Sequence, residues 1–275
     1  MGHHYLDRLI ETAPFRMLME ALRGDDSVGG QFVGTIASQT LRATAAGLER
    51  AKSDAGVVHC LWLMVRLSQC TRDSDFKGML VPARGMPDVT FATLAELPAV
   101  YTVYDLISDY GDAADRHFIG CRSHSDLAEM ARSAGAESLS VLCDKATTGL
   151  FSGPFLDVRD AVREFGRGKG FANLTHEFFG RLVRRYLEYH LSRGLSEHVG
   201  HGRRFASIHE HNDFLRDLGE YARLSTSLIK PYSAQWFEKH QTLNNFNLTM
   251  ATGFVVHAIE KITDGLSRAG GQRRG

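Results

Sequence analysis

The sequence predicts an all-α protein, a multi-helix bundle arranged in two packed helical lobes. Apolar residues recur at helical spacing through most of the 275-residue chain. Strand signals are nearly absent, because no run of alternating β-branched residues recurs and only 6 prolines occur. The hydrophobic fraction of 43% and the charged fraction of 23% are ordinary for a globular domain that builds its own core. Each expected helix follows from its own local pattern.

In the first half, the apolar residues between positions 6 and 22 predict a helical hairpin or a helix kinked at Pro14. Residues 30–53 predict a second helix. Residues 56–71 predict a third, which is hydrophobic nearly all round and is therefore expected at the centre of the fold.

The middle of the chain combines an irregular stretch with two further helices. Residues 78–91 contain two prolines and two glycines, so a short strand could lie there. A helix is expected to start near Pro98. Ser125 is a good N-cap for the next helix, with Asp126 and Glu129 in its first turn.

The second half predicts four more helices. The first spans about 155–165 and ends at "GRGKG", and a long one spans about 173–197. Ser207 starts a capping box and a helix that stops at about 229, before Pro231. The last spans about 249–267, and a basic, frayed tail is expected after about 267.

A polar connector is expected between the last two helices. It includes Trp236, Phe237 and Phe246. These rings are expected to anchor the connector to the core, and stacking on bases or on a partner is the alternative.

The two lobes are expected to meet near residue 151 and to carry opposite charge. Residues 1–150, the N-terminal lobe, contain 14 Lys+Arg and 19 Asp+Glu, whereas residues 151–275, the C-terminal lobe, contain 18 and 13. The basic excess is concentrated in residues 163–204. Such a face indicates a polyanion such as RNA, the protein's own acidic half, or simply a solvated helix surface.

Common catalytic signatures are missing from the sequence. It has no GxSxG elbow, no HExxH pair and no kinase motif set. The stretch "EFGRGKGF" lacks the spacing of a phosphate-binding P-loop, so it is expected to be a flexible loop, with an anion-contacting loop as the alternative.

Cysteine usage and hydropathy indicate the compartment. Cys60 and Cys143 lie in apolar runs, as buried free thiols do, and a disulfide framework is not expected at this size. No secretory signal opens the chain, and its longest apolar run is too short to cross a bilayer. We therefore expect a cytoplasmic protein with no membrane contact.

Residues 196–213 concentrate four histidines, His198, His201, His209 and His211, around an Arg-Arg pair. Zinc needs three or four converging ligands. The number of histidines is adequate, but their spacing is not diagnostic of a metal site, and Arg203 and Arg204 between them would repel a dication. No metal and no cofactor are expected.

The same region contains three Arg-x4-His matches, Arg185–His190, Arg193–His198 and Arg204–His209. This pattern resembles the active-site motif of HEPN-domain ribonucleases. The resemblance implies an all-helical, metal-independent ribonuclease in which a histidine transfers the proton and an arginine holds the scissile phosphate. It covers this region only, and the residues after the arginines are not the Asn, Asp or His that the family usually has.

The sequence therefore leads to two hypotheses. The first is a non-catalytic helical subunit or adaptor of an intracellular multi-protein assembly, which binds a protein partner. The alternative is a HEPN-type ribonuclease with Arg193 and His198 as catalytic residues. Under either hypothesis the candidate binding residues are Arg181, Arg185, Arg203, Arg204 and His209.

Overall fold

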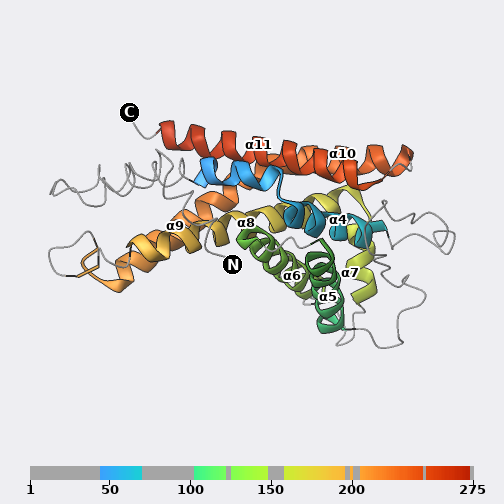
Figure 1. Ribbon diagram of the computed structural model, residues 1–275, viewed down its shortest axis with the longest axis horizontal. Coiled ribbons are helices and arrows are strands. Elements are labelled where there is room, and N and C mark those ends of the chain that lie inside the picture. Colours follow the sequence, from blue (N-terminus) through green and yellow to red (C-terminus); the bar gives the residue numbers. More distant parts are fainter. Residues whose placement is uncertain are drawn as a thin grey trace.

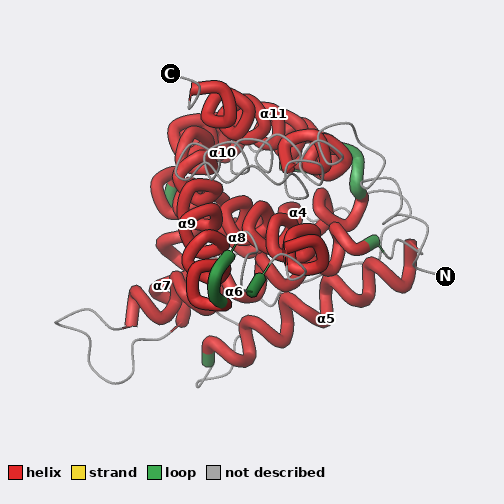
Figure 2. The backbone as a smooth tube through the Cα atoms, turned by 90° about the vertical axis from the view of Figure 1, so that its left-hand side faces the viewer, coloured by secondary structure: helices red, strands yellow, loops and turns green. Residues whose placement is uncertain are grey.

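The all-α prediction is confirmed. The computed structural model describes residues 44–69, 102–121, 125–147, 158–195, 199–200, 205–243 and 246–272. Nearly all of these residues are helical, and they include no strand (Figure 2). An isolated β-bridge joins Val199 to Phe205.

The described part of the chain consists almost entirely of helical elements. In chain order they are η1 (Glu49–Lys52), α4 (Ala55–Gln69), α5 (Val103–Cys121), α6 (Asp126–Thr147), α7 (Val158–Phe165), α8 (Gly168–Leu195), α9 (Ile208–Thr226), η4 (Ser227–Ile229), α10 (Lys230–Leu243) and α11 (Leu248–Gln272). Residues 44–48 are helical and lead directly into η1.

The long helix α8 organises the molecule. Its 28 residues extend about 42 Å, and it packs against α6, α7, α9 and α10. Figure 1 shows three layers, with α10 and α11 above, α4 and α8 in the middle, and α5 and α6 below. Because α8 touches the outer layers on both sides, its sequence has apolar residues on more than one face.

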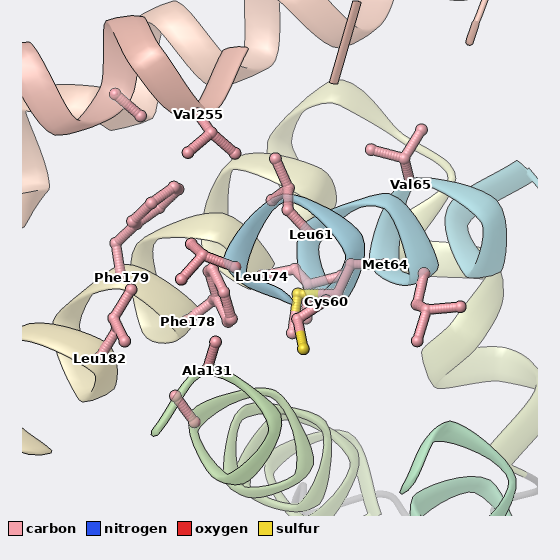
Figure 3. Packing of buried hydrophobic residues seen from close by; sticks show 14 of the residues in the cluster. Cys60, Leu61, Met64, Val65, Ala131, Leu174, Phe178, Phe179, Leu182 and Val255 are labelled. Carbon is pink, nitrogen blue, oxygen red and sulfur yellow. The ribbon is translucent and has the colours of Figure 1, made fainter. Parts of the chain in front are cut away.

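The core is a single hydrophobic cluster in which α4 lies at the centre. Figure 3 shows Cys60, Leu61 and Met64 of α4 among side chains of α6, α8 and α11. Nearly every described residue of α4 is buried, because helices cover it on several sides. The prediction of a central helix at 56–71 is confirmed, with its bounds now Ala55–Gln69.

The N-termini of α4 and α6 are capped by side chains that also bind each other. Asp54 Oδ1 accepts a hydrogen bond from Val57 N at 3.0 Å, and Ser125 Oγ accepts one from Ala128 N at 2.9 Å. Ser125 Oγ donates to Asp54 Oδ2 at 2.6 Å. The N-cap predicted at Ser125 is confirmed, and it fixes the start of α6 beside the start of α4.

The stretch "EFGRGKGF" forms a tight corner between two helices, and the flexible loop expected there is wrong. Helix α7 ends at Phe165 and α8 begins at Gly168, several residues before its expected start. A Cβ on Gly170 would lie 1.8 Å from Glu164 O, so the corner requires a glycine. Gln241 Nε2 donates a hydrogen bond to Gly166 O at 3.1 Å, which ties the corner to α10.

The expected polar connector between the last two helices is also wrong. The chain passes from α9 through η4 into α10, which begins at Lys230 and contains most of that stretch. Pro231 lies in the first turn of α10, where its missing N–H breaks no helical hydrogen bond. Trp236 and Phe237 are buried against Phe171 of α8 and Phe254 of α11, so these rings do anchor the segment to the core.

At the C-terminus, α11 continues to Gln272 instead of fraying after about 267. Its start is capped by Asn247, whose Oδ1 accepts a hydrogen bond from Met250 N at 2.9 Å.

Several sequence predictions lie outside the described residues, namely the helix at 6–22, the irregular stretch 78–91, a helix start near Pro98 and the lobe boundary near 151. Helices from the two sides of residue 151 pack directly on each other, α6 on α8 and α4 on α11. They contribute to one continuous core.

Candidate functional site

The central arginines of α8 form ion pairs with carboxylates of α6 and of α8 itself. Arg181 Nη1 lies 3.2 Å from Glu137 Oε2 of α6, and its Nη2 lies 3.3 Å from Glu177 Oε2. Arg185 Nη2 donates to the other oxygen of Glu137. Both arginine side chains are largely covered, with 22% and 34% of their surface exposed. Two of the predicted polyanion-binding residues are therefore held by carboxylates of this same chain.

A pocket of about 410 Å³ opens beside these ion pairs, between α6 and α8. Helical spacing puts its lining residues on facing surfaces: Glu137, Ser140 and Val141 from α6, and Arg181, Arg184, Arg185 and Glu188 from α8. Arg184 Nε donates to Glu188 Oε1 at 2.7 Å, an i,i+4 ion pair along α8. Glu137 could not be identified from the sequence, because the two helices meet only in the folded chain.

The end of the α8–α9 hairpin is the second place where predicted site residues gather. Gly200 N donates a hydrogen bond to Phe205 O at 2.8 Å. This bond joins the segment that follows α8 to the segment that precedes α9. Gly200 has a φ of 136°, a conformation that favours glycine. Phe205 is buried and packs against His211 and Phe214 of α9.

The two described histidines of this region have different surroundings. His209, in the first turn of α9, is 85% exposed, and its Nε2 lies 3.4 Å from Asp213 Oδ2. His211 is half-buried, with its ring 5.4 Å from that of Phe205. His209 and His211 therefore do not converge. His198, His201, Arg203 and Arg204 lie outside the described residues, as does the side chain of Arg193, whose backbone is in the last turns of α8.

Of the three Arg-x4-His matches, one has a described arginine side chain. That arginine is Arg185, which is bound to Glu137. The side chain of its partner His190 is not described. For the pair Arg193–His198, the structure describes only the backbone of Arg193. For the pair Arg204–His209, it describes only His209, whose ring is exposed.

The buried thiols have the properties of core residues. Cys60 and Cys143 are free cysteines with no exposed surface, as predicted. Burial raises the pKa of each thiol to about 12. Both therefore stay protonated at neutral pH and are poor nucleophiles.

A pair of buried histidines had no clear signal in the sequence beyond the position of His59 in an apolar run. The rings of His59 on α4 and His117 on α5 are stacked, with centroids 3.5 Å apart and planes 4° from parallel. Burial, followed by the nearby His117, lowers the pKa of His59 to about 3. Burial also lowers the pKa of His117. Both rings are thus neutral at pH 7, and they serve the packing of α5 on α4.

Within the described ranges, no three His, Cys, Asp or Glu side chains are arranged to hold a metal ion. No helix in those ranges combines the length and the apolar character needed to cross a membrane. Comparison with known proteins finds no matching family model, no matching curated protein and no matching solved structure.

Proposed function

We propose that this protein is a non-catalytic helical subunit or adaptor that binds a protein partner through the end of its α8–α9 hairpin. The observation that supports this proposal most is the pairing of Arg181 and Arg185 with Glu137. These arginines of the basic region are balanced inside the fold. Two further arginines of that region, Arg203 and Arg204, lie in the sequence between α8 and α9.

The hairpin end is well placed for a partner. Figure 1 shows it reaching beyond α6 and α10. Its described surface includes the exposed Ile208 and His209 at the start of α9. An exposed aliphatic side chain next to polar and cationic groups is a common composition for the contact surface of a non-obligate complex.

The same ion pairs argue against RNA binding at Arg181 and Arg185. A carboxylate that already pairs with an arginine repels a phosphate, and this repulsion weakens the net attraction of that arginine for RNA. The ribonuclease hypothesis meets this obstacle at Arg185. It is kept as an outcome of the experiment below.

The experiment compares the chain with two double charge reversals. Arg203→Glu with Arg204→Glu alters the hairpin end, and Arg167→Glu with Lys169→Glu makes the same change of charge on exposed residues at the other end of α8. Partners cross-linked to the tagged protein in cells are identified by mass spectrometry, and each is then purified and its binding measured. We expect the first variant to lose the partner and the second to keep it, since charge reversal at a contact leaves like charges facing each other.

Two results would contradict the proposal. One is a partner that binds both variants and the unaltered protein equally. The other is cleavage of RNA in the presence of EDTA that disappears in His198→Ala while RNA binding persists, because a catalytic histidine supplies proton transfer and not affinity. That result would establish the ribonuclease.

A further inference from the structure

The cavity between α6 and α8 has the size of a small-ligand site. Its volume of about 410 Å³ lies within the range of pockets that hold small molecules. Val141 contributes an apolar surface and Ser140 a hydroxyl group, so a ligand would meet both kinds of contact. The dominant feature of the lining is nevertheless the group of three arginines on one turn of α8, Arg181, Arg184 and Arg185.

The charges of the lining favour an anion. Three guanidinium groups of the lining face the carboxylates of Glu137 and Glu188. Glu177, which is not part of the lining, pairs with both Arg181 and Lys145, so the four cations exceed the three carboxylates by one positive charge. Charges that line a concave, partly desolvated surface act more strongly than charges on an open surface. An anionic group placed in the cavity would restore neutrality.

The hydrogen-bond donors are also in excess. Arg184 uses only its Nε, toward Glu188, and neither of its terminal nitrogens has an acceptor in the described part of the chain. Arg185 donates to Glu137 through Nη2 only, so its Nη1 has no acceptor among the described residues. The Nε atoms of Arg181 and Arg185 also lack an acceptor within the described ranges, but they are buried and do not face a ligand in the cavity. Terminal guanidinium nitrogens, which form a fixed fork, are suited to the paired oxygens of a carboxylate or phosphate group.

We propose that this cavity binds a small molecule bearing a carboxylate or phosphate group, and that Arg184 and Arg185 donate the hydrogen bonds to it. Arg181 and Glu137 position Arg185 through the shared carboxylate. Glu137 also repels the ligand's anionic group, so its charge limits the affinity. This site is separate from the hairpin end, and the proposal goes beyond the proposed function.

Isothermal titration calorimetry on the full chain tests this site with two probes, inorganic phosphate and succinate, each in sodium chloride of matched ionic strength. We expect saturable binding of at least one probe with one site per chain. Phosphate alone would identify a phosphate-bearing ligand, succinate alone a carboxylate-bearing one, and both a general oxyanion site.

Two variants test the assignment of residues. Arg184→Gln removes a charge from a side chain that is 62% exposed, so we expect the variant to fold. It should weaken binding about tenfold or more, the usual effect of losing a charged hydrogen bond. Glu137→Gln keeps the side-chain shape and removes the repulsion, so it should strengthen binding several-fold. Arg167→Gln, the same replacement outside the cavity on the corner before α8, should leave binding unchanged.

The proposal is overturned if neither probe binds beyond the effect of sodium chloride. It is also overturned if Arg184→Gln and Glu137→Gln bind like the unaltered protein. A role limited to stability would lower the resistance of Glu137→Gln to urea, but it would not strengthen its binding of either probe.

Discussion

His59 is the buried side chain whose protonation should control the acid stability of the fold. It is 2% exposed on α4 and stacks on His117 of α5. A proton on His59 would place a charge beside that second ring and away from water. The backbone of Ala113 compensates such a charge only in part, because the effect of burial on the pKa of His59 is larger.

The sign and size of the effect follow from the pKa of His59, which burial lowers to about 3 in the folded protein. In the unfolded chain the pKa returns to about 6.5. Between these values the unfolded chain binds the proton and the folded one does not, so stability is complete above about pH 6.5 and falls as the pH decreases. At about pH 5 the expected loss from this one group is about 2 kcal/mol, relative to about pH 8.

Urea unfolding followed by circular dichroism at a series of pH values measures this loss. The key comparison is with His59→Leu, which cannot be protonated and fits an apolar site. Between about pH 8 and pH 5, the unfolding free energy of this variant should fall by about 2 kcal/mol less than that of the unaltered protein. His257→Leu replaces a part-exposed histidine of α11 and should keep the original slope. An unchanged slope in His59→Leu would refute the reasoning.

Three further outcomes can be measured on the purified protein. Gly56→Ala should destabilise the fold by about 1–3 kcal/mol in the same urea assay, because the new Cβ would lie 2.2 Å from Ala128 Cβ. Gly253→Ala should stabilise α11 by about 0.5–1 kcal/mol, because the space around Gly253 is open. Ser207→Ala removes the hydroxyl that accepts from Glu210 N at 3.2 Å, so it should cost about 1 kcal/mol; an equal midpoint for variant and parent would show that the cap is not used. Elemental analysis of the full chain should find no stoichiometric transition metal, and about one zinc per chain would overturn this expectation.

Local patterns explain why several helix boundaries followed correctly from the sequence. Ser125 and Ser207 cap their helices through hydrogen bonds to residues three positions ahead, so the whole interaction lies within one turn. The central position of α4 likewise follows from its own composition, since a helix that is apolar on all sides must be covered on all sides.

The errors occurred where a neighbouring element determines the local structure. Gly166, Gly168 and Gly170 predict a flexible loop when read alone. In the fold, Gly170 is buried where the backbone carbonyl of Glu164 comes too close for a side chain. The segment that was expected to be a polar connector is helical because Trp236 and Phe237 are packed between α8 and α11.

The sequence by itself determined the helical class, the helix caps, the buried thiols and the opposite charges of the two halves. All of these depend on residue type and short-range spacing. Only the tertiary structure decided how the charges are used: Glu137 and Arg185 are 48 positions apart, and α6 must pack on α8 before the carboxylate can bind the guanidinium groups. Ion pairing and the stacking of His59 on His117 require contact within a few ångströms, which spacing along one helix cannot specify.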